Sequence, residues 1–188
     1  MLNRRNLILS SAAAVLTAAV PATALAQHVP NAAQIERSLS AAPRKRLRRQ
    51  DRVERRELKR RRDLRVAAPS IDIQAINFEF GSARIPHSEQ WKAEEIAIAM
   101  RRILRRNPAE VFLIEGHTDA VGSRYSNQIL SEQRAASLRR VLVRRFGVDG
   151  YALETIGYGE DYLLVPTPEP EWRNRRVTLR RVTDFVVR

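Results

Sequence analysis

The chain has 188 residues, enough for one folded domain with extensions rather than two full domains. It contains no cysteine, which excludes disulfides, thiolate metal sites and cysteine nucleophiles. Its formal net charge of +13 is concentrated, because residues 44–65 carry a net +9 whereas residues 66–188 carry only +2. Since nucleic-acid-binding domains present a basic face on the fold itself, the near-neutral C-terminal part argues against nucleic acid as a partner.

Residues 1–26 have the pattern of an export signal. Arg4 and Arg5 form a positive start, residues 7–20 are apolar, and Ala24-Leu25-Ala26 supplies a small–x–small cleavage site. The apolar stretch is shorter than the ~20 residues that a membrane-spanning helix needs. We therefore predict cleavage after Ala26 and a periplasmic location at the cell wall or outer membrane. The paired arginines leave general secretion and twin-arginine export both open.

Residues 27–68 are predicted to be a flexible and strongly basic N-terminal arm. The segment 27–43 is small, polar and alanine-rich, as in a flexible lead-in. The segment 44–65 lacks glycine and proline and has acid–base pairs at helical i,i+4 spacing, but its few apolar residues keep no heptad. It is expected to be a solvated single helix or disordered. Two interpretations stay open: a charged spacer, or an arm (Arg44–Arg65) that binds an anionic lipid, an acidic glycopolymer or a protein partner.

Residues 69–188 have the pattern of a compact α+β domain. The expected elements, in chain order, are a strand over 70–80, a helix over 88–107, a strand over 111–115, a helix from about 124 to 146, a strand over 151–157 and an edge strand over 175–182. Ser88 is the expected N-cap of the first helix, Trp91 belongs to its apolar stripe, and Gly147 should end the second helix. This order predicts a β-α-β-α-β-β sandwich of two helices packed on a mixed sheet.

The stretch EGHTDAVGSRYSNQILSEQR (residues 115–134) concentrates the chemistry of the domain. His117 and Asp119 lie near serines, but no nucleophile elbow or second paired carboxylate accompanies them, which argues against catalysis. The chain's three histidines have no close ligand spacing, so neither a metal nor another cofactor is expected. A phosphate site needs more glycines and a lysine, and Asp119 would repel phosphate.

A binding loop for a zwitterion remains. Asp119 follows the strand, while Asn127 and Arg134 are seven apart and share one face of the following helix. A carboxylate can hold an ammonium group, and a guanidinium can hold a carboxylate through two hydrogen bonds. The competing interpretation is a structural salt bridge between Asp119 and Arg134, and the residues alone leave both open. A binding site requires the two side chains to stand apart, open to solvent.

Five motifs in this order resemble the OmpA C-terminal-like peptidoglycan-binding domains. They are FEFGSARI (78–85), EGHTDAVGS (115–123), NQILSEQRA (127–135), GYGE (157–160) and NRRV (174–177). The resemblance covers roughly residues 71–183. It implies non-covalent binding of peptidoglycan through the diaminopimelate of the stem peptide, without turnover.

The resemblance also implies roles for individual residues. Asp119 would take the ammonium group of diaminopimelate and Arg134 its carboxylate, which Asn127 and loop N–H groups would assist. Arg175, expected in the neighbouring strand, would give a supporting contact, and Gly116 and Thr118 would shape the loop.

The sequence departs from the family pattern at two positions. Gly81 and Val121 stand where members often have polar residues, so contacts from those positions would be lost. No long alternating-strand region precedes the domain, and no cysteine is present for lipidation. A soluble periplasmic member without a β-barrel or a lipid anchor is therefore expected.

Overall fold

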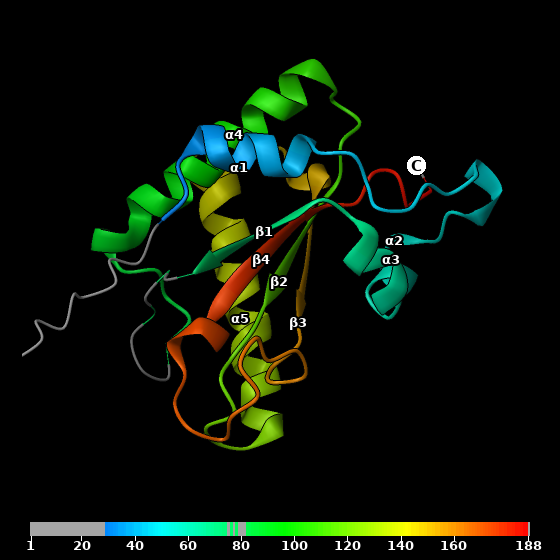
Figure 1. The fold of residues 1–188 in the computed structure, drawn as a ribbon. Coiled ribbons are helices and arrows are strands. Elements are labelled where there is room, and N and C mark those ends of the chain that lie inside the picture. Colours follow the sequence, from blue (N-terminus) through cyan, green and yellow to red (C-terminus); the bar gives the residue numbers. More distant parts are fainter. Residues whose placement is uncertain (1–28, 75, 77, 79–81, 188) are drawn as a thin grey trace, which may run out of the picture.

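A computed structural model describes residues 29–187, except residues 75, 77 and 79–81 (Figure 1). The predicted signal peptide and Gly81 thus lie outside the described residues. The elements are α1 (Ala32–Ser40), η1 (Arg49–Asp51), α2 (Arg55–Leu58), α3 (Arg62–Ala67), β1 (Ser70–Gln74), η2 (His87–Glu89), α4 (Gln90–Arg106), β2 (Phe112–Gly116), α5 (Arg124–Arg144), η3 (Gly150–Ala152), β3 (Leu153–Gly157), η4 (Trp172–Asn174) and β4 (Arg176–Arg181). Within the described part of the chain, no helix is long and apolar enough to cross a membrane.

The four strands form one mixed sheet in the order β1-β4-β2-β3 (Figure 1). The strands β2 and β3 are parallel, whereas β4 is antiparallel to both of its neighbours. The α+β class, the mixed sheet and the central position of β2 are confirmed. The prediction that the last strand lies at an edge is wrong, because β4 is paired on both sides. Its alternating polar residues are covered by other segments: Arg180 contacts Arg65 of α3, and Arg176 contacts Tyr162 after β3.

The main core lies between one face of the sheet and three helices. Alternate strand residues such as Phe112 and Ile114 of β2 are fully buried against α4 and α5. The helix α5 begins at the predicted residue and ends two residues early, and Gly147 follows it with φ of 65°, as predicted for a left-handed cap. The helix α4 corrects two details. Ser88 lies in η2 rather than at the N-cap, and Trp91 is 51% exposed rather than part of the apolar stripe.

The third helix on this face is α1, so the expectation of a flexible lead-in over 27–43 is wrong. Asn31 and Gln34 form a capping box at its start. Ile35 and Leu39 are 1% and 0% exposed and belong to the same core as the sheet. Because Ile35 and Leu39 are spaced i,i+4, they lie on one face of α1, and this apolar face packs on α4.

The basic segment 44–65 covers part of the opposite face of the sheet, which corrects the expectation of a solvated or disordered arm. It forms three short helical pieces, η1, α2 and the start of α3, rather than a single helix (Figure 1). Val53, Leu58 and Leu64 are buried in a second cluster with Leu113 of β2 and Phe185 near the C-terminus. Successive side chains of a strand point to opposite faces of the sheet, so Leu113 points away from the face that carries Phe112 and Ile114. This cluster therefore lies on the face of the sheet opposite the main core.

Two glycines let α5 approach the sheet closely at the strand ends. A Cβ at Gly116 would lie 2.2 Å from the backbone oxygen of Ser131, and one at Gly157 would lie 2.3 Å from the backbone nitrogen of Glu132. These distances are too short for any side chain. The two glycines therefore bring the helix that carries Arg134 against the C-terminal ends of β2 and β3.

Candidate functional site

The loop after β2 crosses the C-terminal end of the sheet. The N–H of His117 donates to the carbonyl of Arg176 at 3.0 Å, and that of Thr118 donates to Gly159 at 2.9 Å. Ser123 then caps α5 by accepting a hydrogen bond from the N–H of Ser126. The loop is thus hydrogen-bonded to β4 and to the residues that follow β3, and Asp119 comes directly after these two contacts.

Asp119 forms an ion pair with Arg175, whose Nη1 is 2.7 Å from Asp119 Oδ2. The carboxylate is 12% exposed and the guanidinium 45% exposed. Arg175 follows η4 and directly precedes β4, so the expectation that it lies in the strand is off by one residue. Within the described part of the chain, Asp119 Oδ1 has no hydrogen-bond partner.

Arg134 is buried on α5 and is only 8% exposed. Its Nε donates to the carbonyl of Ser82 at 3.4 Å, and its guanidinium lies 4.9 Å from the ring centre of Phe78. Burial lowers the pKa of Arg134, and the charge of Arg175 lowers it further, while the charge of Asp119 opposes the shift. Arg134 forms no ion pair with any described residue. Among the described residues it is thus a buried cation without a carboxylate partner.

These positions exclude one of the two interpretations of the sequence, and the zwitterion-binding loop stays a prediction. Asp119 and Arg134 stand apart without an ion pair, so the structural salt bridge between them is wrong. The expectation that both are open to solvent is also wrong, since each residue is 8% exposed. Asp119 pairs with Arg175 instead.

Asn127 holds the loop. Its Nδ2 is 3.3 Å from the carbonyl of Asp119, 3.2 Å from that of Val121 and 2.6 Å from Glu160 Oε2. The N–H groups of this amide are therefore directed at the protein itself. Glu160 is the residue that sequence reasoning missed here, although it ends the GYGE motif. A direct contact of Asn127 with a ligand stays a prediction.

Thr118 and Gly116 occupy different positions in the loop. Thr118 is 2% exposed, and its buried Oγ1 has no hydrogen-bond partner among the described residues. Gly116 is fixed by its contact with Ser131 of α5. Gly116 therefore sets the distance between the loop and α5, while Thr118 keeps an unsatisfied polar atom beside Asp119 in the chain.

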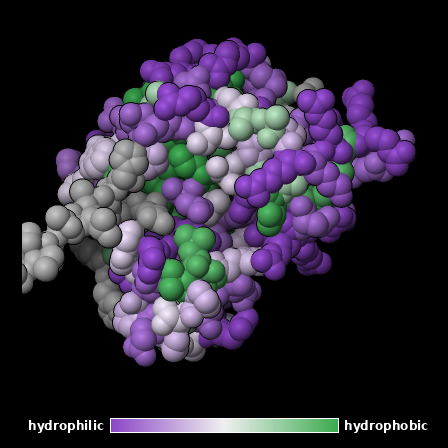
Figure 2. All heavy atoms as spheres, in the orientation of Figure 1, coloured by the Kyte–Doolittle hydropathy of each residue, from purple (hydrophilic) through white to green (hydrophobic). Residues whose placement is uncertain are grey.

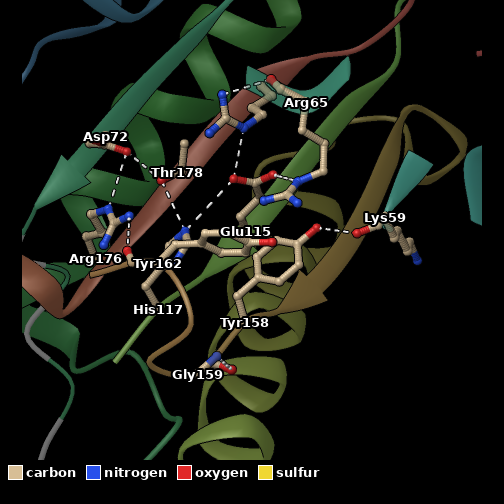
Figure 3. Close-up of polar contacts among 12 residues, drawn as sticks. Lys59, Arg65, Asp72, Glu115, His117, Tyr158, Gly159, Tyr162, Arg176 and Thr178 are labelled. Carbon is tan, nitrogen blue, oxygen red and sulfur yellow. Dashed lines mark hydrogen bonds and ion pairs between the residues drawn. The ribbon is translucent and has the colours of Figure 1, made fainter. Parts of the chain in front are cut away.

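His117 faces the sheet rather than the loop. Its Nε2 is 3.3 Å from Thr178 Oγ1 on β4 and 3.9 Å from Glu115 Oε2 (Figure 3). Burial lowers the pKa of His117 well below its usual range, and the charges of Arg176, Arg180 and Arg65 act in the same direction. His117 is therefore neutral at pH 7, and its role is structural. No group of three or more metal-ligating side chains occurs among the described residues.

A buried charge network behind the loop was not predicted. Glu115 is fully buried and pairs with Arg65 of α3 at 2.7 Å and with Arg180 of β4 at 2.8 Å (Figure 3). The Arg65 guanidinium also lies 3.9 Å from the ring centre of Tyr158, whose hydroxyl donates to the carbonyl of Lys59. A glutamate inside an apolar strand was the available signal, because a buried carboxylate requires a cation.

Comparison with known proteins identifies the fold and the family. The model of the OmpA family matches residues 77–176, which include Gly116, Thr118, Asp119, Asn127, Arg134 and Arg175. The chain is 35% identical over 104 residues to outer membrane porin F of Pseudomonas aeruginosa, covering 54% of this chain and 29% of the relative. It is 41% identical over 71 residues to the peptidoglycan-associated lipoprotein of Pseudomonas putida, covering 37% of this chain and 42% of the relative.

Among solved structures, the periplasmic domain of Helicobacter pylori MotB matches with a TM-score of 0.51 and 22% identity, over 60% of this chain and 74% of that chain. This likeness shows the fold. The chain spans less than half the length of the two curated relatives. Since the family model covers more than half of this chain, the chain belongs to the OmpA family.

Proposed function

We propose that this protein binds peptidoglycan non-covalently in the periplasm, through the diaminopimelate of the stem peptide and without turnover. Its site would hold one amino-acid centre that carries both an ammonium and a carboxylate group. Arg134 is the residue for the carboxylate and Asp119 the residue for the ammonium.

The buried state of Arg134 is the observation that carries this proposal. A buried charge is costly unless an opposite charge and hydrogen bonds compensate it. The Arg134 guanidinium has one hydrogen bond, at 3.4 Å, and no ion pair with the described residues. A carboxylate that enters beside it would gain two charge-assisted hydrogen bonds and relieve this cost. An anionic group is therefore the ligand that the position favours.

Asp119 supplies the second half of recognition. Arg175 binds its Oδ2, and Oδ1 remains available to an ammonium donor. Arg175 itself keeps 45% exposure, so its other nitrogen atoms can reach a ligand. In this arrangement Arg175 orients Asp119, and the guanidiniums of Arg134 and Arg175 would both attract the carboxylate of the ligand.

The relatives support the same class of ligand. One is named for its association with peptidoglycan and another is an outer membrane protein. We extend the association with peptidoglycan from these relatives to this chain as part of the proposal, and the periplasmic location belongs to the same proposal. The proposed contact with a single stem is small, so its affinity should be modest. The wall presents many stems, and rebinding would retain the protein on it.

Co-sedimentation with purified sacculi tests the proposal. We expect Arg134→Gln and Asp119→Asn each to lower binding by about tenfold, the effect of losing about 1.4 kcal/mol of charge-assisted hydrogen bonding. Arg140→Gln is the matched control, because Arg140 is exposed on the same helix. Walls with lysine in place of diaminopimelate lack the side-chain carboxylate and should bind less. If both site variants sediment like wild type, or if lysine walls bind equally, the proposal fails.

A further inference from the structure

The N-terminal arm divides its positive charges between two faces. Its inner cations hold it to the domain: Arg55 and Lys59 pair with Glu154 of β3 at 3.4 and 3.3 Å, and Arg65 pairs with buried Glu115. The inner apolar side chains Val53, Leu58 and Leu64 fill the second hydrophobic cluster. The arm is therefore a fixed part of the folded protein.

The outer cations have no such partners. Seven are exposed and form no ion pair with described residues, and we call them the basic face: Arg44, Lys45, Arg46, Arg49, Arg56, Arg60 and Arg62. Three of the four acidic residues in the arm are already paired with arm arginines: Asp51 with Arg48, and Glu57 and Asp63 with Arg61. Figure 2 shows that this side of the molecule, at its right-hand edge, is predominantly hydrophilic.

Exposed apolar groups accompany these charges. Tyr151 is 88% exposed, and its carbonyl accepts a hydrogen bond from Arg55 of the arm. Val187 is 36% exposed and lines a shallow hollow together with three arm cations and the two carboxylates of Glu54 and Glu154. A purely ionic polymer offers nothing to these side chains. A bilayer surface offers both phosphate groups for the cations and an interfacial region that favours tyrosine.

The first part of the basic face lies away from the site, because the arm packs on Val111 at the beginning of β2, whereas Asp119 follows the end of that strand (Figure 1). The end of the arm reaches further, since Arg65 pairs with Glu115 near the end of β2 and Arg62 lies 5.1 Å from the ring centre of Tyr162. Because the cations are held on a folded segment, binding costs little backbone ordering.

We propose that the basic face docks on a bilayer surface that contains anionic phospholipids. Docking is electrostatic and peripheral, with Tyr151 and Val187 at the headgroup level. The protein would then contact a membrane with one end while the other end engages its ligand.

Vesicle co-sedimentation tests this proposal with the chain that begins at Gln27, which keeps every described element. The vesicles are phosphatidylcholine alone and phosphatidylcholine mixed with phosphatidylglycerol. We expect binding only to the mixed vesicles, and its loss at about 1 M salt, where the Debye length is about 3 Å. Binding to soluble polyglutamate without binding to the mixed vesicles would identify an acidic polymer as the partner and overturn the bilayer proposal.

A pair of matched variants separates the basic face from overall charge. Arg56→Gln/Arg60→Gln and Arg101→Gln/Arg105→Gln each remove two exposed arginines, from the arm and from α4 respectively. The first should weaken vesicle binding by about tenfold or more, and the second should change it little. Equal losses in the two variants would overturn the assignment to this face. Both variants should retain sacculus binding, so this test is independent of the proposed function.

Discussion

Asp119 pairs with Arg175 at 2.7 Å, and buried Arg134 has no ion pair within the part of the chain that the structure describes. This relationship changes the expected chemistry of the site. Arg175 is compensated by Asp119, whereas Arg134 has no ion pair with a described residue. The carboxylate of the ligand, rather than its ammonium group, should therefore contribute most to binding.

Replacement of Arg175 tests its role in orienting Asp119. Arg175→Ala should weaken binding to sacculi by up to about fivefold, because a half-exposed ion pair contributes about 0–1 kcal/mol. Arg173→Ala is the control, since Arg173 pairs with Glu171 and has no contact with Asp119. The measurement is a sacculus binding isotherm for each variant. Tighter binding by Arg175→Ala would instead show that Arg175 competes with the ligand for Asp119.

Gly116 is expected to be intolerant of a methyl group. Gly116→Ala would place Cβ 2.2 Å from the carbonyl oxygen of Ser131, so α5 must move away from β2. Overpacking of this kind costs about 1–3 kcal/mol in the free energy of unfolding. Gly150→Ala is the control, because its Cβ would meet only side-chain atoms at 3.4 Å or more. Urea denaturation of both variants gives the comparison, and equal stability would contradict the close packing.

The buried ion pair between Arg65 and Glu115, which holds the arm to the sheet, should contribute far more to the free energy of unfolding than an exposed pair does. Arg65→Met leaves Glu115 buried with only Arg180 as its cation, and we expect a loss of about 3 kcal/mol in unfolding free energy. Arg61→Met removes the exposed pairs with Asp63 and Glu57 and should lower the free energy of unfolding far less. Chemical denaturation measures both. If the two losses are similar, Arg65 does not hold the arm as described.

His117 should give the fold a pH dependence. Its pKa is lowered in the folded state, so the unfolded chain binds the proton first as pH falls below about 6.5. Stability should therefore decrease with falling pH, by up to about 1.4 kcal/mol per pH unit from this group. His117→Gln should remove that part of the slope between pH 6.5 and 5, whereas His87→Gln, at an exposed position, should keep it. Thermal unfolding across this range would show no difference between the variants if His117 were not responsible.

The sequence predicted those elements whose burial pattern is local. The run VFLIE is apolar at nearly every position, and β2 is buried throughout. The helix α5 and its glycine cap follow from apolar spacing and Gly147. The capping box of α1 was also readable, but Ile35 and Leu39 were too few to stand out in an alanine-rich segment.

The arm and β4 could not be predicted for a common reason. Val53, Leu58 and Leu64 are buried from three different short segments, so they follow no single helical period. Without the arm in place, the polar alternation of β4 resembles a solvated edge. Only the tertiary structure shows that these two segments cover each other, with Arg180 donating to the carbonyl of Arg65.

The sequence proposes the residues of the candidate site, but it does not predict the ion pair between Asp119 and Arg175. Asp119 and Arg134 were placed at one end of the sheet from motif and periodicity. The partner of Asp119 lies 56 residues away, and its proximity depends on β4 lying beside β2. Likewise, the contact of Asn127 with Glu160 requires the end of β3 to meet the start of α5.

The contact between Val53 and the C-terminal segment has a consequence for the order of folding. The N–H of Val53 donates to Phe185, and Val53 accepts from Val187, so the arm docks on a segment that comes much later in the sequence. A chain that emerges N-terminus first cannot complete this contact until Val187 has been made. Pairings this distant also form slowly, because a long loop must close first. The most basic segment of the protein should therefore settle on the sheet late in folding.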